Sequence, residues 1–177
     1  MNTPKVADNA TDPNVGVITP RNQWLQALRQ ATAEVFSTMV GATLDAPATP
    51  GSISTPSPPD TSLVAYVTGM IGIAGAVRAV FSLGCSDRAA IRMASQMLAI
   101  PAEEAAAQKS DAIGEVCNMI AGQFKHTIGH GFSCTLTVPT VVVGGNYSIH
   151  CLEKGERIEF SVLYEGEAIL IRLDIRG

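Results

Sequence analysis

Residues 111–128 read DAIGEVCNMIAGQFKHTI, and the pattern of this segment is the clearest structural signal in the chain. At about 100° per residue, one side of an α-helix would carry the apolar residues Ile113, Cys117, Ile120, Phe124 and Ile128. The opposite side carries a second group within roughly 60° of one another, Asp111, Glu115, Asn118 and Gly122. The segment therefore predicts a long helix, from about Ala102 to Gly129, that packs its apolar side against a sheet and turns the other side outward.

The residue types on the outward side are poor choices for a helix that only needs to be stable. Asn disfavours helix interiors, and Gly114 and Gly122 each cost up to about 1 kcal/mol relative to Ala. Glycines that flank this side also remove side chains that would block the approach of another backbone or of a partner. We therefore predict a docking face, with an ordinary solvated helix face as the alternative.

Upstream, the sequence predicts a first long helix, a hairpin and a short helix. Apolar residues recur three and four positions apart from Gln23 to Val40, and Gly41 can end this helix; they are Trp24, Leu28, Ala31, Val35 and Met39. Two apolar segments, 63–73 and 77–83, are separated by residues 74–76 and suit a hairpin. Ser86 can then cap a short helix that ends near Pro101.

Downstream of residue 132, the chain predicts strands. Apolar and polar residues alternate strictly over 157–162, and a second strand is expected over 168–175 after a Glu-Gly-Glu turn. Such alternation is typical of a half-exposed antiparallel sheet. The expected fold class is therefore α+β, with two long helices and a short one packed on a mainly antiparallel sheet.

The first long helix and the second can be aligned without gaps at an offset of 81 residues, 30–41 on 111–122. The same offset places the strand from Leu63 on about 145–152 and the strand from Ala76 on that from Arg157. We interpret this as an internal repeat of a helix-strand-strand unit. Both copies have a glutamate, Glu34 and Glu115, but they differ three residues later. There the first copy has Ser37 and the second has Asn118.

Composition limits the other possibilities. Residues 1–20 predict a mobile N-terminal arm, residues 46–62 a flexible Pro/Ser/Thr-rich loop, and residues 21–177 a single domain. A net charge of -4 without a basic stripe argues against nucleic acid as a partner. The N-terminus has no apolar signal region, and segment 63–83 is interrupted by Arg78 and glycines, so we expect a cytoplasmic protein without a membrane span.

The cysteines and histidines predict no metal site. The four cysteines are widely separated, which favours reduced buried thiols, with two disulfides as an alternative. His126 and His130 are four residues apart on one helix, a spacing that can hold a metal, and Cys134 follows. The HEXXH glutamate is missing, so we interpret these histidines as capping or solvated side chains.

The pattern D/S-x3-E-x2-N followed by Met-Ile-Ala-Gly resembles the signature helix of the CheC/CheX/FliY phosphatases of bacterial chemotaxis. Asp111, Glu115 and Asn118 fill the three positions, and the order of elements over 21–177 is similar to that family. One intact motif is most like single-site CheX. In the first helix, Gln30 and Ser37 occupy the Asp/Ser and Asn positions, and we expect that half-site to be silent.

The resemblance implies a phosphatase that acts on the aspartyl phosphate of a CheY-like receiver domain. The receiver would bring its own Mg²⁺ and lysine, so this chain needs no cofactor. Asn118 would hold the attacking water, Glu115 would pair with the lysine, and Asp111 and Gly122 would contact the docked partner. Two alternatives stay open: a non-catalytic adaptor for a receiver or a flagellar switch component, and a homodimer formed through exposed sheet edges.

Overall fold

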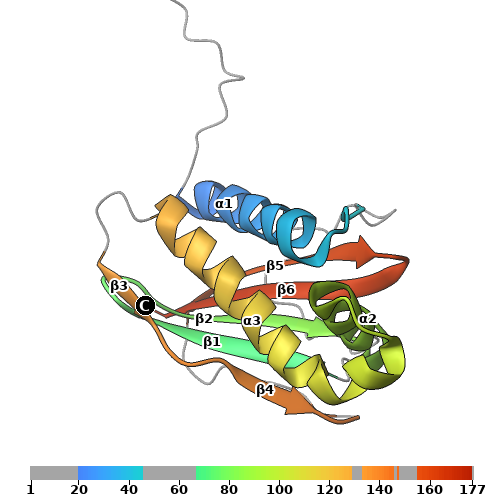
Figure 1. The fold of residues 1–177 in the computed structure, drawn as a ribbon. Coiled ribbons are helices and arrows are strands. Elements are labelled where there is room, and N and C mark those ends of the chain that lie inside the picture. Colours follow the sequence, from blue (N-terminus) through green and yellow to red (C-terminus); the bar gives the residue numbers. More distant parts are fainter. Residues whose placement is uncertain (1–19, 46–66, 129–132, 146, 148–154, 177) are drawn as a thin grey trace, which may run out of the picture.

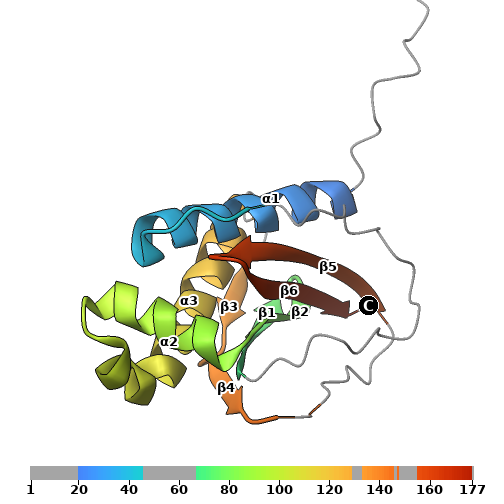
Figure 2. The same cartoon turned by 90° about the vertical axis from the view of Figure 1, so that its right-hand side faces the viewer.

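Two antiparallel hairpins form most of a six-stranded sheet, and the helices cover one of its faces (Figures 1 and 2). The computed structural model describes residues 20–45, 67–128, 133–145, 147 and 155–176. The elements are α1 (Pro20–Val35), a π-helical turn η1 (Phe36–Val40), β1 (Val67–Gly75), β2 (Arg78–Cys85), α2 (Asp87–Leu98), α3 (Ala102–Ile128), β3 (Cys134–Leu136), β4 (Thr140–Val143), β5 (Gly155–Tyr164) and β6 (Glu167–Arg176). The predicted loop, 46–62, and the predicted arm, 1–20, lie outside these residues, except that Pro20 is the first residue of α1.

The strands run in the order β3-β1-β2-β6-β5, and β4 also pairs with β1. Every strand pairing is antiparallel. The predicted α+β class is therefore confirmed, with two long helices and a short one on an antiparallel sheet. The described part of the chain contains no helix that is long and apolar enough to cross a membrane.

A helix followed by a hairpin does occur twice, as α1–β1–β2 and as α3–β5–β6. The second strands of the two hairpins, β2 and β6, pair with each other. The first strands, β1 and β5, lie on either side of this pair and are therefore the equivalent strands of the two units. The strand at Arg157 is thus the first of its hairpin, whereas the constant offset aligned it with the second strand of the other. The offset fails because β3 and β4 lie between α3 and its hairpin, and most of segment 145–152 lies outside the described residues.

The first helix ends in a π-helical turn that the sequence pattern did not predict. Gly41 ends it in a left-handed conformation (φ 73°) and donates its backbone N–H to the carbonyl of Phe36, five residues earlier. A π turn holds more residues than an α turn, so the inward direction shifts along the sequence. Val40 is therefore buried, while Met39, predicted to face the core, is 43% exposed.

The short helix predicted to follow Ser86 is confirmed as α2. The hydroxyl of Ser86 accepts a hydrogen bond from the backbone N–H of Ala89, at 3.1 Å, and so caps its first turn. Ala99 ends it in a left-handed conformation two residues before Pro101. Ion pairs from Arg88 to Glu167 and from Arg92 to Glu165 then tie α2 to the turn between β5 and β6.

The third helix, α3, lies directly on β1 at Gly69. A Cβ atom built on Gly69 would lie 2.4 Å from the Sγ atom of Cys117 and 3.0 Å from a methyl group of Ile113. Any side chain at position 69 would therefore force α3 away from the sheet. The predicted apolar side of α3 is buried, completely so at Ile113, Cys117, Ile120 and Phe124.

Candidate functional site

The site predicted from the sequence lies on the outward side of α3, which crosses the middle of the helix-covered face in Figure 1. Asp111, Glu115 and Asn118 are exposed, and a Cβ atom on Gly122 would have no other atom within 4 Å. The structure thus brings all four residues to one surface. We call Asp111, Glu115, Asn118 and Gly122 the α3 stripe.

Glu115 and Asn118 are neighbours because residues three apart lie next to each other on an α-helix. The side chains of Asp111, Glu115 and Asn118 form no hydrogen bond or ion pair with the rest of the described chain. Their carboxylate and carboxamide groups are therefore available to a partner. The rigid helix beneath them fixes the spacing between these groups.

Other secondary-structure elements flank the α3 stripe on both sides. On one side is α1, where the side-chain amide of Gln123 donates a hydrogen bond to the carboxylate of Glu34, at 3.0 Å. On the other side is the sheet edge, since Pro139 and Val141 lie 3.6 Å from a Cβ atom built on Gly114. The predicted site for a partner is the surface of α3 between α1 and the sheet edge.

Gly114 flanks the α3 stripe, and the neighbours that it faces belong to this protein's own sheet edge rather than to a partner. It is buried, and it faces Pro139 and Val141 rather than solvent. Its angular position on the helix is about 60° from that of Asp111, which turns it towards β4. The periodicity of α3 could not show these neighbours, because Pro139 and Val141 are about 25 residues away from Gly114 in the sequence.

The first-helix copy of the motif lacks the chemistry of the second. Gln30, Glu34 and Ser37 are all exposed, but the carboxylate of Glu34 already accepts the hydrogen bond from Gln123. Ser37 lies in the π-helical turn and has no carboxamide. This geometry supports the prediction that the first half-site is silent.

The cysteines offer no nucleophile in the described part of the chain. Cys85, Cys117 and Cys134 are free and buried, as predicted, while Cys151 lies outside the described residues. Burial, reinforced by the negative charge of Asp87, raises the pKa of Cys85 to about 12. Burial also raises the pKa of Cys117 far above its usual range, so this thiol beside Asn118 in sequence is a neutral core group.

Among the described residues, no group of three or more His, Cys, Asp and Glu side chains is placed to hold a metal ion. His126 is exposed near the end of α3, and the Sγ atom of Cys134 lies 3.9 Å from the carbonyl of Val77. His130 lies outside the described residues.

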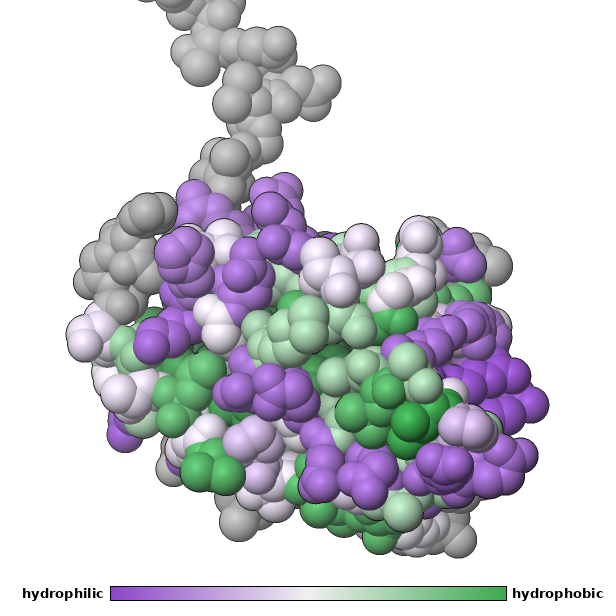
Figure 3. Space-filling view, in the orientation of Figure 1, coloured by the Kyte–Doolittle hydropathy of each residue, from purple (hydrophilic) through white to green (hydrophobic). Residues whose placement is uncertain are grey.

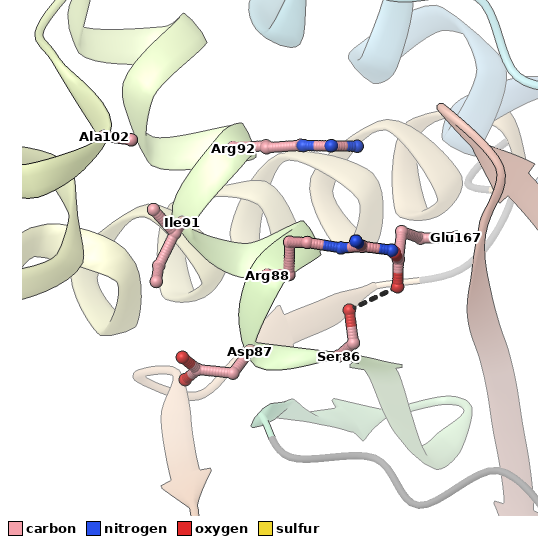
Figure 4. Close-up of a pocket in the computed structure, with 7 residues that line it drawn as sticks. All are labelled: Ser86, Asp87, Arg88, Ile91, Arg92, Ala102 and Glu167. Atoms are coloured by element: carbon pink, nitrogen blue, oxygen red, sulfur yellow. Dashed lines mark hydrogen bonds and ion pairs between the residues drawn. The ribbon is translucent and has the colours of Figure 1, made fainter.

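A separate pocket lies at the start of α2 (Figure 4), lined by Ser86, Asp87, Arg88, Ile91, Arg92, Ala102 and Glu167. Its charged groups are engaged within the protein. Glu167 accepts hydrogen bonds from Ser86, at 2.7 Å, and from Arg88, and Lys109 pairs with Asp87 at 2.5 Å. These interactions hold α2 against the sheet and against α3. The pocket contributes no residue to the α3 stripe.

The fold places an exposed carboxylate, Glu115, and an exposed carboxamide, Asn118, on one continuous helix surface. Residues 67–163, more than half of the chain, match the family model of the chemotaxis phosphatase CheX. The protein therefore belongs to the CheX family of chemotaxis phosphatases.

Solved structures share this fold. A CheC-like superfamily protein from Shewanella sp. PV-4 is 21% identical, with a TM-score of 0.73 over 88% of this chain and 98% of the other. CheX from Vibrio vulnificus is 23% identical, with a TM-score of 0.70 over 89% and 99%. A CheX–CheY–BeF3–Mg²⁺ complex from Borrelia burgdorferi matches at 22% identity and a TM-score of 0.70 over 87% and 98%. No curated protein sequence matches closely enough to add to this assignment.

Proposed function

We propose that this protein accelerates hydrolysis of the aspartyl phosphate of a CheY-type receiver domain, and that the α3 stripe is the catalytic surface. One observation carries the proposal. Glu115 and Asn118 lie exposed and side by side on α3, without hydrogen bonds or ion pairs to other described residues, in a member of a phosphatase family. The CheX–CheY complex from Borrelia burgdorferi supports a CheY receiver as the partner.

The receiver already holds most of what the reaction needs. A Mg²⁺ ion and a lysine neutralise the phosphoryl oxygens, so the missing component is a water molecule in line with the bond to the aspartate. The side-chain oxygen of Asn118 would accept a hydrogen bond from this water and direct its lone pair at phosphorus. The water oxygen would then bond to phosphorus as the bond to the aspartate oxygen breaks. Inorganic phosphate and a proton are released, and the receiver keeps its aspartate as a free carboxylate.

The carboxylate of Glu115 would form an ion pair with the receiver lysine. Such charge-assisted hydrogen bonds are directional, so this contact orients the docked receiver as well as attracting it. Asp111, one turn earlier on α3, would extend the acidic surface along the interface. This chain would bind no metal itself, and the Mg²⁺ would arrive with the receiver.

The direct test uses a panel of CheY receivers, phosphorylated with a small phosphodonor in the presence of Mg²⁺. We expect at least one receiver to lose phosphate faster when this protein is added. Binding to a receiver without faster loss of phosphate would support the adaptor alternative instead. Neither binding nor faster loss with any receiver would reject both.

Gly122 offers a test of the docking surface with a matched control. Replacing Gly122 or Gly114 by Ala should stabilise the fold by about 0.5–1 kcal/mol, because Ala is the better helix former. A Cβ atom has open space at Gly122 and only ordinary contacts of 3.6 Å at Gly114. Urea unfolding should show this gain for both variants.

Only Gly122→Ala should also weaken receiver binding, by about fivefold or ~1 kcal/mol, since the added methyl group faces the partner. Titration with a receiver activated by Mg²⁺ and beryllofluoride measures this effect. Equal binding by wild type and both variants would remove Gly122 from the interface.

A further inference from the structure

The connection between β3 and β4, residues 137–139, carries an apolar side chain that the catalytic proposal does not use. Val138 is 84% exposed, more than the other exposed large apolar residues of the described chain, Met39, Leu98 and Val143. Figure 3 shows separate apolar patches towards the lower edge of the helix-covered face, where β4 runs in Figure 1. A single exposed apolar residue is common on protein surfaces, so the position of Val138 relative to the α3 stripe decides whether a partner could cover it.

The structure holds this connection firmly. The backbone N–H of Thr137 donates to the carbonyl of Gly72, and the N–H of Gly72 donates to the hydroxyl of Thr137, both at 2.9 Å. On the other side of Val138, the ring of Pro139 packs against α3 at Gly114. The projecting valine therefore loses little conformational freedom when a partner covers it, and a preorganised contact of this kind favours binding.

Val138 also lies close to the α3 stripe. From the contact between Pro139 and Gly114, its Cα atom is within roughly 10 Å of that of Gly114, and Glu115 is the next residue of the helix. A stable interface covers about 800 Å² of each partner, a patch of about 16 Å radius. A receiver centred on Glu115 and Asn118 would therefore reach Val138.

We propose that Val138 is a second docking contact for the receiver domain and packs against an apolar patch beside the receiver's phosphorylation site. The proposal rests on the proposed function, because the position of the receiver on the α3 stripe brings it over Val138. A second copy of this chain at the same sheet edge is the competing occupant, and the test below distinguishes the two.

The test compares Val138→Asp with Val138→Ile and with a control, Leu98→Asp. Leu98 is 49% exposed and lies at the end of α2, beside the start of α3. Glu115 is about 20 Å further along that helix, beyond the expected footprint. Both positions changed in these three variants are on the surface, so thermal unfolding should stay close to that of wild type.

Dephosphorylation of a CheY receiver, followed over a range of receiver concentrations, separates docking from the chemical step. Val138→Asp should raise the half-saturating receiver concentration at least tenfold and leave the saturating rate within twofold of wild type. Val138→Ile and Leu98→Asp should leave both values within twofold.

An unchanged half-saturating concentration for Val138→Asp would overturn the docking proposal alone, provided that wild type accelerates hydrolysis and Asn118→Ala does not. A change from dimer to monomer caused by Val138→Asp, seen by light scattering, would assign the valine to a second copy and also overturn it. Failure of wild type to accelerate hydrolysis or bind any receiver would overturn both proposals.

Discussion

Asn118→Ala should slow receiver dephosphorylation at least about 100-fold at saturating receiver, because the attacking water loses the group that positions it. The side chain is exposed and forms no hydrogen bond with other described residues, so its removal should not disturb the fold. Release of inorganic phosphate from a phosphorylated CheY receiver measures the loss. Binding should persist, since Glu115 and the rest of the surface are intact.

Ser37→Ala provides the matched control for this variant. Ser37 occupies the position of Asn118 in the first-helix copy and is equally exposed, but it has no carboxamide to place a water. We expect its replacement to leave the rate within twofold of wild type. If Asn118→Ala dephosphorylates the receiver as fast as wild type, the α3 stripe is not the catalytic surface.

Gly69→Ala should lower the free energy of unfolding by about 2–3 kcal/mol, because the added methyl group overlaps the Cys117 side chain where α3 meets β1. Urea denaturation of both proteins gives the difference. The same change should reduce phosphatase activity, since displacement of α3 alters the surface that carries Glu115 and Asn118.

A double-mutant cycle shows whether the contact itself is responsible. With Cys117→Ala in the background, the sulfur atom 2.4 Å from the new Cβ is gone, and the cost of Gly69→Ala should fall by at least about 1 kcal/mol. Part of the cost should persist because Ile113 still approaches to 3.0 Å. Simple additivity of the two changes would show that the overlap is relieved elsewhere.

Local periodicity was sufficient to predict most of the fold. The alternation at 157–162 placed Ile158, Phe160 and Val162 in the core, and the helical spacing of α3 placed its apolar side on the sheet. The candidate residues could be grouped on one surface for the same reason. All of them lie on one continuous helix, whose geometry is known before any tertiary contact is considered.

The sequence pattern could not show contacts between segments that are distant in sequence. The burial of Gly114 beside Pro139 and Val141 is one such contact, and the hydrogen bond from Gln123 to Glu34 in another helix is a second. The π-helical turn left only an ambiguous trace, since both Met39 and Val40 are apolar and either could continue the helical pattern. In the folded protein Val40 is buried and Met39 is exposed. The spacing of apolar residues alone could not show which of the two would face the core.

The π-helical turn at Phe36–Val40 also bears on how a one-site protein of this fold could change into a two-site protein. Ser37→Asn would restore the residue type, but its side chain would still project from a turn closed by a bond spanning five residues rather than four. We expect that a working second site needs a one-residue deletion in this turn as well. Point substitutions would then be insufficient, and gain or loss of the site during divergence would be recorded as a length change in the first helix.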